Sequence, residues 1–588
     1  MKSKKLLALL LALVLVFSTA LVACGEKAEA EKPAEEQAEA TENVVQQDED
    51  TVTTAAAEEV TEETKMDETQ IIDFNLGNEP QSLDIARGTD TYSSQILVET
   101  TEGLLRVLQD ENGVDKVTPA GAESWDVSED GTVWTFHLRD YNWEDGKAVT
   151  AMDFEYGVKR VLAPETASQY AFLLYPILNA QEYNMGEAEV DAVGVKAVDE
   201  KTLQFTLKAP CAYFEGIAGF KTTYPQRQDV IEEHGEKWGS EADLALSCGP
   251  FKVTEWVHDN MIVLEKNAAY WDADSVILEK VNCHIIKDQD AGYNSLFNGS
   301  IDMGGVSKPE WIEKFEGTGD FNLIKGYSAG TNYMLFNQKD PLFANLKVRQ
   351  AFSLAINREE MANVIFHGIN EAAYGWITPA LTCQGTEYRS AVEEPLKALA
   401  EQYPDPKALL IEGLKELGLN EDPTQLTVSF LNASTTQWSR TYTEYLQQMF
   451  KQALGVNLEG EYVEWGVYLD RTDNFEFQLG GAAWIGDYND PMTFSDMFMT
   501  GAGIVQTGWT SEEYDNLLKE AQGSMDKELR LANFAKAEKI LVADDVAIAP
   551  TVYRKRNTFV RKYVKNLMIP LFGGGVEFKY AYTDGKTK

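Results

Sequence analysis

The sequence is poor in the side chains that most often bind metals or form disulfides. Only five cysteines and five histidines occur in 588 residues. No two cysteines have the C-x-x-C spacing of zinc or thiol-exchange sites, and the histidines lie too far apart to suggest a shared metal. We therefore expect no disulfide scaffold, no metal site and no cofactor. The sequence does not predict whether Cys211, Cys248, Cys283 and Cys383 pair.

Positive charge is also scarce. The chain has 51 Lys and Arg against 95 Asp and Glu, a net charge of −44. Binding to nucleic acid requires clusters of Lys and Arg that contact phosphates, so we expect no nucleic-acid partner. The length exceeds what one ordinary core accommodates and predicts several structural units.

Long hydrophobic runs are absent except at the very start of the chain. Lysines at positions 2, 4 and 5 precede an apolar run from Leu6 to Val22, which ends at Ala23-Cys24-Gly25. This arrangement is typical of a secretory signal and resembles the bacterial lipobox, in which the cysteine is lipidated. We expect residues 1–23 to be a lipoprotein signal peptide. Cys24 would then hold the protein, through its lipid, at the extracellular face of the cell membrane.

A strongly acidic segment follows the lipobox. Residues 26–68 contain 16 acidic and 3 basic side chains and no aromatic residue. Such a composition buries too little apolar surface to offset the entropy lost on ordering, and its like charges repel each other. We predict an extended, disordered tether over residues 24–68.

From Gln70 onward the pattern is that of a globular α/β protein. Residues 124–139 predict a β-hairpin with Asp130-Gly131 in its turn. Thr150 and Asp153 have the spacing of a capping box at the start of a helix. Further strands are expected at 71–76, 426–430, 456–463 and 475–485, and helices at 92–105 and 435–454. The unit from 426 to 463 predicts two parallel strands joined by a helix.

Three short motifs imitate catalytic or metal sites. Residues 326–330 match the G-x-S-x-G nucleophile elbow, but the sequence after them predicts a strand where the elbow needs a helix. Residues 126–131 resemble the first half of a calcium loop, although His137 stands where a glutamate ligand is needed. Asp487, Asp490 and Asp496 form a loose acidic cluster in an acidic chain. We interpret residues 326–330 as a turn or hinge and residues 126–131 as a hairpin turn. The acidic cluster is weak evidence for a glycosidase or metal site.

Several motifs, in order, resemble one known family. Residues 134–139 (WTFHLR), 143–146 (WEDG) and 150–154 (TAMDF), with Arg160, are similar to the signature of the bacterial extracellular solute-binding proteins of the oligopeptide and dipeptide type, family 5. Further similar stretches are 79–84, 249–251, 267–271, 336–337, 348–351 and 484–491. Members of this family are the receptors of ABC importers.

The resemblance implies an α/β, periplasmic-binding-protein-like fold with three lobes. Two lobes, domains I and III, would enclose the ligand, and domain II would lie beside domain I. The implied boundaries are 69–101, 216–326 and 554–588 for domain I, 102–215 for domain II and 327–553 for domain III. The chain would cross between the enclosing lobes near Gly326 and Tyr553, which implies a hinge at residues 326–330.

The resemblance also implies which residues bind the ligand. The peptide binders of the family hold an extended peptide between two segments through backbone hydrogen bonds. The first segment corresponds to Thr89, Asp90 and Thr91, and the second to Ala483, Trp484 and Ile485. Asp487 would receive the α-ammonium group of the peptide, and Trp465 would form an aromatic wall of a side pocket.

The sequence departs from the family at several of these positions. An arginine and a glutamate present in some relatives are Gly481 and Met334 here, and a cysteine pair corresponds to Ala329 and Ile485. These changes leave ligand length and carboxylate binding open.

We expect no enzyme. The expected function is that of a monomeric lipoprotein that captures di- or oligopeptides in a closing cleft and delivers them to the permease of an ABC transporter. A binder of an oligosaccharide, haem or a nickel complex on the same fold is the alternative within this class. A surface hydrolase is the alternative from another class.

Overall fold

The computed structural model describes residues 66–573 and 575–586. The predicted signal peptide, Cys24 and nearly all of the predicted tether lie outside the described residues. All described residues fall in one compact unit. Among them, no helix has both the length and the apolar character that crossing a membrane requires.

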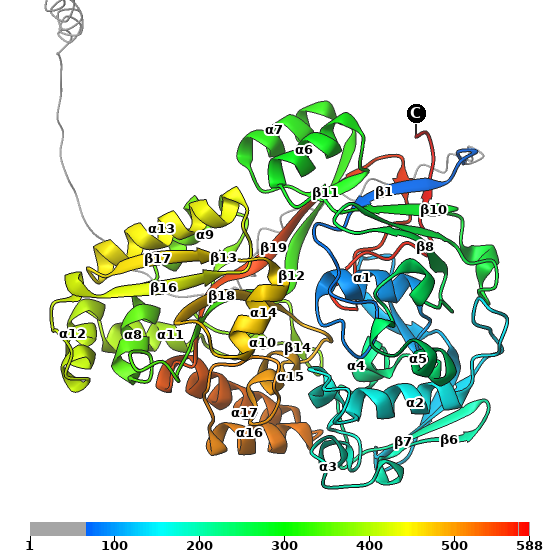
Figure 1. Cartoon of the computed structure of the whole chain (residues 1–588), viewed down its shortest axis with the longest axis horizontal. Coiled ribbons are helices and arrows are strands. Elements are labelled where there is room, and N and C mark those ends of the chain that lie inside the picture. Colours follow the sequence, from blue (N-terminus) through cyan, green and yellow to red (C-terminus); the bar gives the residue numbers. More distant parts are fainter. Residues whose placement is uncertain (1–65, 574, 587–588) are drawn as a thin grey trace, which may run out of the picture. The chain divides into compact units, whose positions relative to one another are not determined.

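One large mixed sheet runs through the described part of the chain (Figure 1). Its strand order is β17-β16-β18-β12-β19-β11-β1-β10-β9-β8, and β13 pairs with β19. The strands are β17 (Asn457–Tyr462), β16 (Thr427–Asn432), β18 (Leu479–Ile485), β12 (Phe321–Phe336), β19 (Ile548–Arg561), β11 (Met303–Gly305), β1 (Ile71–Asn75), β10 (Lys280–His284), β9 (Met261–Lys266), β8 (Phe251–Val257) and β13 (Glu371–Ala372). The sheet therefore joins segments that the sequence assigned to two different lobes.

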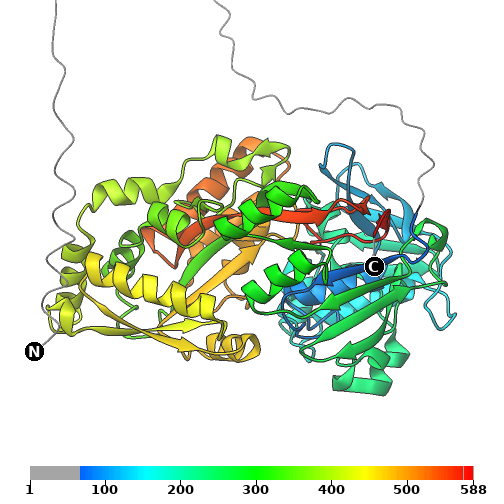
Figure 2. The ribbon, with the colours of Figure 1, turned by 90° about the horizontal axis from the view of Figure 1, so that it is seen from above.

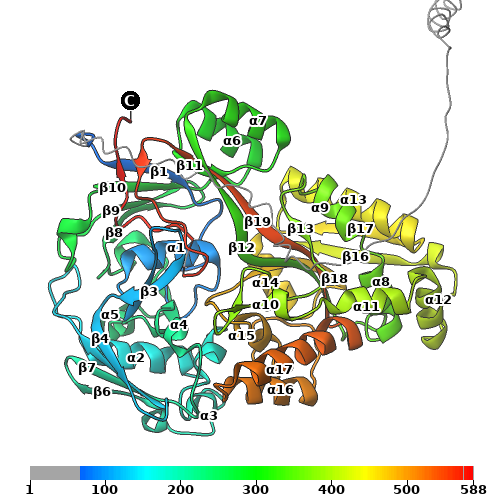
Figure 3. The ribbon, with the colours of Figure 1, turned by 180° about the vertical axis from the view of Figure 1, so that it is seen from behind.

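Strands β12 and β19 connect the two halves of this sheet. They pair with each other antiparallel, and β12 also pairs with β18 while β19 also pairs with β11. In Figure 2 the red strand β19 runs from the orange and yellow half of the sheet toward the blue half, and Figure 3 shows it beside β12 from behind. The β12–β19 register shifts between Tyr327 and Thr331 and again between Asn332 and Tyr333.

The G-x-S-x-G sequence at residues 326–330 lies entirely within β12. A nucleophile elbow needs a sharp turn into a helix, whereas here the strand continues to Phe336. Gly326 has φ of 142°, a backbone conformation that disfavours other residues. The structure thus explains the motif by strand geometry rather than by catalysis.

A separate four-stranded antiparallel sheet and helix α2 contain most of the residues that carry the family resemblance. The strand order of this sheet is β4-β5-β7-β6, and helix α2 packs against β6 and β7. The elements are β4 (Ala122–Val127), β5 (Val133–Leu138), β7 (Thr202–Thr206), β6 (Val195–Asp199) and α2 (Ala151–Leu162). The predicted hairpin and the Thr150–Asp153 capping box are both present. Phe136 is fully buried against Phe205, so this part of the signature serves the core.

Two predicted elements have different ends in the structure. The helix expected over 92–105 is α1 (Thr91–Thr100), because Leu105 already begins strand β2 (Leu105–Gln109). The strand expected from Phe475 begins only at Leu479, because Phe475 has φ of 59°, outside the β region. The strand–helix–strand unit is confirmed: α13 (Gln437–Ala453) joins β16 and β17, which pair in parallel.

Helices surround the sheets. They include α6 (Gln289–Asn298), α7 (Pro309–Thr318), α8 (Leu346–Leu354), α9 (Arg358–Val364), α11 (Pro395–Gln402), α12 (Pro406–Glu416), α16 (Glu512–Gln522) and α17 (Lys527–Lys539). Near the site, α14 (Trp465–Asp473) precedes β18 in the chain. The carboxyl end of β18 and the amino end of α1 line one cavity.

Candidate ligand-binding cavity

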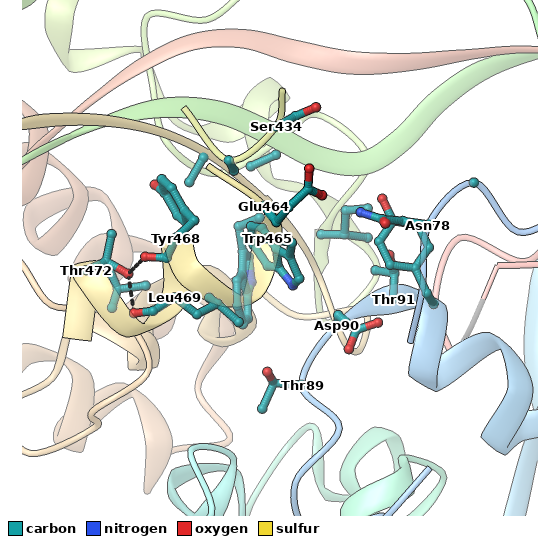
Figure 4. Close-up of a pocket in the computed structure, with 18 of the residues that line it drawn as sticks. Asn78, Thr89, Asp90, Thr91, Ser434, Glu464, Trp465, Tyr468, Leu469 and Thr472 are labelled. Carbon is teal, nitrogen blue, oxygen red and sulfur yellow. Dashed lines mark hydrogen bonds between the residues drawn. The ribbon is translucent and has the colours of Figure 1, made fainter. Parts of the chain in front are cut away.

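A cavity of about 600 Å³ lies between the amino end of α1, the end of β18 and helix α14. This volume is in the range that small-molecule and peptide sites occupy. All eight residues that the sequence assigns to the ligand line it: Thr89, Asp90, Thr91, Trp465, Ala483, Trp484, Ile485 and Asp487. In Figure 4 the α14 residues lie on one side of the cavity and Asn78, Asp90 and Thr91 on the other. The structure brings the two predicted segments together, while their roles in binding stay predictions.

The first segment is fixed in place by the side chain of Asp90. This carboxylate caps α1, since Oδ1 accepts the Ser93 backbone N–H at 2.8 Å and Oδ2 accepts the Ser93 hydroxyl at 2.7 Å. Oδ2 also accepts the Gln81 backbone N–H at 3.1 Å. Asp90 is only 7% exposed. Its carboxylate is therefore used by the fold, and what this segment offers a ligand is the backbone on either side of it.

The second segment has an open hydrogen-bonding edge. β18 pairs with β12 along its whole length, but with β16 only as far as Gly480. The Gly486 N–H donates to the Ala329 carbonyl at 2.7 Å. Because bonding positions alternate along an antiparallel ladder, the N–H and C=O groups of Ala483 and Ile485 point away from β12. No strand among the described residues pairs with this edge beyond Gly480.

Asp487 lies just beyond that edge and has one oxygen without a partner. The Tyr170 hydroxyl donates to Oδ1 at 3.3 Å, and Oδ2 is buried with no hydrogen bond to any described residue. The Asp487 backbone N–H donates to Thr493 Oγ1 at 2.9 Å. Burial raises the pKa of this carboxyl to about 7, although the Lys221 ammonium group and the Tyr170 and Thr493 hydrogen bonds lower it in part. A cation placed at Oδ2 would restore full ionisation.

Lys221 is a functional candidate that the sequence analysis missed. It is 3% exposed, and its Nζ donates to the Gly88 carbonyl and to Ser94 Oγ, both at 2.6 Å. The ammonium lies 5.1 Å from the centre of the Tyr170 ring. Burial lowers its pKa to about 8, while Asp90 and Asp487 act in the opposite direction. A lysine in an unremarkable segment carries no sequence signal that marks it as buried beside a carboxylate.

Aromatic rings form two walls of the cavity. Trp465 stacks on Tyr468, with ring centres 5.6 Å apart and planes 10° from parallel. The Trp465 indole N–H and the Tyr468 hydroxyl are both buried without a hydrogen-bond partner among the described residues. Trp484 stacks on Tyr170 at 6.3 Å and donates its indole N–H to the Thr493 carbonyl at 2.8 Å. Such walls combine apolar area with unused polar groups.

Two positions at which the sequence departs from the family pair with each other in the sheet. Gly481 of β18 pairs with Met334 of β12. A Cβ atom at Gly481 would lie 2.8 Å from the Phe430 ring, so Phe430 takes the space that a side chain would need. The four described cysteines are all buried and unpaired.

The acidic cluster at residues 487–496 separates into three different environments. Asp490 accepts a hydrogen bond from Arg530 at 2.8 Å, and Asp496 accepts one from the Tyr488 hydroxyl at 3.0 Å. Of the three, only Asp487 lines the cavity. No group of three possible metal ligands occurs in residues 66–573 or 575–586.

The sequence and structure are similar to those of known binding proteins. The family profile of the bacterial extracellular solute-binding proteins, family 5 (middle region), matches residues 116–506. The chain is 32% identical to the dipeptide-binding protein DppE of Bacillus subtilis over 501 residues, 85% of this chain and 89% of that protein. It is 31% identical to the oligopeptide-binding protein OppA of B. subtilis, over 87% of this chain and 92% of OppA.

Solved structures of similar proteins have the same fold. Listeria monocytogenes OppA bound to peptide superposes with a TM-score of 0.80 at 29% identity, covering 89% of this chain and 100% of that one. The Escherichia coli murein tripeptide-binding protein MppA gives 0.79 at 26% identity, covering 89% and 100%. MppA in its unliganded open form gives only 0.57 at 27% identity, covering 88% and 98%. The periplasmic-binding-protein-like fold expected from the sequence is confirmed.

Proposed function

We propose, because the chain belongs to the bacterial extracellular solute-binding proteins of family 5, that it captures peptides in the cavity between β18 and α1. The family binds substrates, and we infer that this chain delivers its peptide to the permease of an ABC importer without transforming it. One observation carries the choice of a peptide: the open edge of β18 ends at a buried carboxylate oxygen that has no partner among the described residues.

The open edge suits an extended backbone. The N–H and C=O groups of Ala483 and Ile485 alternate at the spacing of a strand, so a peptide would add to β18 as a further strand. The backbone beside Asp90 would bind its other edge. Contacts of this kind ignore side-chain identity, which suits a receptor for many sequences.

Asp487 is placed to bind the first residue of that peptide. A charged α-amine that loses its water in the cavity needs a fixed opposite charge. The free Oδ2 provides it, and the amine would in turn lower the raised pKa of the carboxyl. Trp465 would pack against a side chain of the peptide.

We further propose that the cavity closes around its ligand. The higher similarity to MppA than to its unliganded open form supports a closed arrangement here. A hinge at β12 and β19 is supported by the register shift between Tyr327 and Thr331, at the crossing expected near Gly326 and Tyr553. The three-lobe boundaries given above and the lipid anchor at Cys24 belong to the same proposal.

Calorimetry on four combinations tests the amine site. We expect Asp487→Ala to weaken binding of a free peptide by about 3–5 kcal/mol, because it leaves the buried ammonium unpaired. That is on the order of a hundredfold to a few thousandfold in Kd. N-acetylation of the peptide should weaken binding to the unmutated protein by a similar factor. The two changes together should be far from additive, since both remove one interaction.

A matched control separates this effect from a general loss of negative charge. Asp470 is an exposed carboxylate of α14 that does not line the cavity, so Asp470→Asn should leave Kd unchanged. If N-acetylated peptides bind the unmutated protein as tightly as free ones, Asp487 does not bind the amine.

A further inference from the structure

Arg554 of β19 lines the same cavity and is a charge without a partner. Its guanidinium makes no hydrogen bond, ion pair or stacking contact with any described residue. The other buried arginines are all bonded. Arg106, Arg160, Arg227, Arg389 and Arg530 bond to carboxylates, and Arg349 and Arg358 to backbone carbonyls. A guanidinium carries five N–H donors, and those of the half-buried Arg554 are free for a ligand.

A glycine lets this side chain lie across the sheet. Gly330 of β12 is the last residue of the G-x-S-x-G sequence, and a Cβ atom there would lie 3.0 Å from Arg554 Cδ. Gly330 pairs with Ile485 at the end of β18. The β12–β19 register breaks next to Arg554, between the pairs Tyr327–Lys555 and Thr331–Tyr553. The arginine therefore crosses β12 toward the end of β18, where the proposed peptide edge lies.

Three acids of the cavity lining or of the strand beside β19 have other partners. Glu371 is bonded to Lys555 at 2.7 Å, and Glu464 to the Thr435 hydroxyl at 2.8 Å. Glu464 also lies 3.8 Å from Lys287, and the Asp90 carboxylate caps α1. Burial lowers the pKa of Arg554, and the only opposing influence comes from the Tyr92 hydroxyl group, since no carboxylate offsets it.

We propose that Arg554 binds a carboxylate of the ligand and selects for ligands that carry one. This inference rests on the proposed peptide-binding function and names a chemical class within it. A planar guanidinium binds a carboxylate through two parallel hydrogen bonds, which would use donors that the fold leaves free. The carboxylate comes either from the C-terminus of a short peptide or from an Asp or Glu side chain of a longer one. Asp487 and Arg554 would then each bind a ligand group of opposite charge in the cavity.

The test compares peptides with and without each carboxylate. The first arm is the alanine series from di- to pentaalanine, each as a free acid and as a C-terminal amide. The second arm is Ala-Glu-Ala amide against Ala-Gln-Ala amide, with the glutamate also moved to the first and third positions. Calorimetry is carried out on the unmutated protein, on Arg554→Gln and on Arg554→Lys.

We expect removal of the relevant carboxylate to weaken binding to the unmutated protein by about tenfold to a hundredfold, in one of the two arms. In Arg554→Gln the same removal should change Kd by less than about twofold, because the two changes delete one interaction. Arg554→Lys should restore part of the preference, since lysine keeps the charge but not the planar fork. Arg440→Gln is the control, since Arg440 is exposed and does not line the cavity.

The outcomes separate this inference from the function on which it rests. Equal binding of acids and amides in both arms, with N-acetylation still weakening binding, would overturn the role of Arg554 and leave the peptide function intact. A carboxylate preference that persists unchanged in Arg554→Gln would overturn it as well. If no peptide binds at all, the peptide function is wrong and the role of Arg554 fails with it. Thermal unfolding of each variant shows that the fold is retained.

Discussion

Two regions of this protein bury charged side chains, and they differ in whether those side chains have hydrogen-bond and ion-pair partners. In the first, Arg106 is 5% exposed and lies among three buried carboxylates. Its Nε and Nη2 bond to Glu577 at 2.6 and 3.0 Å, and its Nη1 bonds to Glu102 at 3.0 Å. Tyr270 and Trp271 donate to the other oxygen of Glu102 at 2.8 and 2.9 Å. Glu99 Oε2 makes no hydrogen bond but lies 3.5 Å from Arg106 Nη2, so each of the three carboxylates is paired with the guanidinium.

The cavity shows the opposite arrangement. Among the described residues, Asp487 has a buried oxygen without a partner and Arg554 has an unbonded guanidinium, while Lys221, beside the lining residue Tyr170, bonds only to neutral groups. Burial shifts the pKa of Asp487 and of Lys221 toward the neutral form, so the hydrogen bonds and charges around them do not fully offset the loss of water. In the Arg106 network the bonded charges hold the structure together, whereas at the cavity the unbonded ones are available to a charged ligand.

Breaking the Arg106 network should have the largest effect on stability. Arg106→Met would leave Glu99, Glu102 and Glu577 buried together without their cation. We expect a loss of about 3–5 kcal/mol in the free energy of unfolding, measured by urea denaturation. Arg554→Met, at an unbonded arginine, should change this free energy far less or raise it. Equal losses for the two variants would contradict the distinction between the regions.

A smaller effect should appear when the unpartnered carboxylate is neutralised. The pKa of Asp487 is raised from 3.8 to about 7 by burial, so the folded protein holds this proton more tightly than the unfolded chain does. Below about pH 4, Asp487 is therefore protonated in both states and does not change the free energy of unfolding. As the pH rises to about 7, Asp487 lowers this free energy more and more, and the loss stays constant at higher pH. Asp487→Asn should stabilise the ligand-free protein by about 1–3 kcal/mol at pH 8 and by almost nothing at pH 4.

The measurement is the difference in unfolding free energy between variant and unmutated protein across this pH range. Taking the difference cancels the titration of groups that do not interact with Asp487; Lys221 does interact with it, and its pKa should fall further in the variant because the Asp487 charge raises it. Saturating peptide should reverse the sign of the difference at pH 8, because the ligand stabilises only the protein that binds it. A difference that is independent of pH would contradict the raised pKa.

The sequence predicted the parts of the site that depend on local pattern. The strand–helix–strand unit of β16, α13 and β17 follows from the sequence pattern. The eight candidate residues were implied by the family resemblance, and all of them line the cavity, while their roles stay predictions. Strand ends were less predictable. Phe475 belongs to an apolar alternating run, but its positive φ delays β18 to Leu479, and only tertiary packing fixes such a conformation.

The charges of the cavity were predictable only in part. Asp487 follows a predicted strand, so its place at the strand end could be inferred. Lys221 and Arg554 come from segments far apart in the sequence, and no spacing rule connects either with residue 487. The sequence does not show which hydrogen bonds and ion pairs each charged side chain makes, because these depend on the assembled fold.

The smallest effect concerns a third kind of charge, an exposed pair at the rim of the cavity. Lys287 and Glu464 lie 3.8 Å apart, and their side chains are 38% and 61% exposed. Both line the cavity, from segments assigned to different lobes. Solvent screens such a pair, so Glu464→Gln should weaken peptide binding by no more than about 1 kcal/mol, or about fivefold. The loss should vanish at about 1 M salt, where the Debye length is about 3 Å.

The control variant is Glu459→Gln, because Glu459 is an exposed glutamate of β17 that does not line the cavity. A loss as large as that of Asp487→Ala, or one that persists at high salt, would show that exposure does not separate these charges from the buried ones.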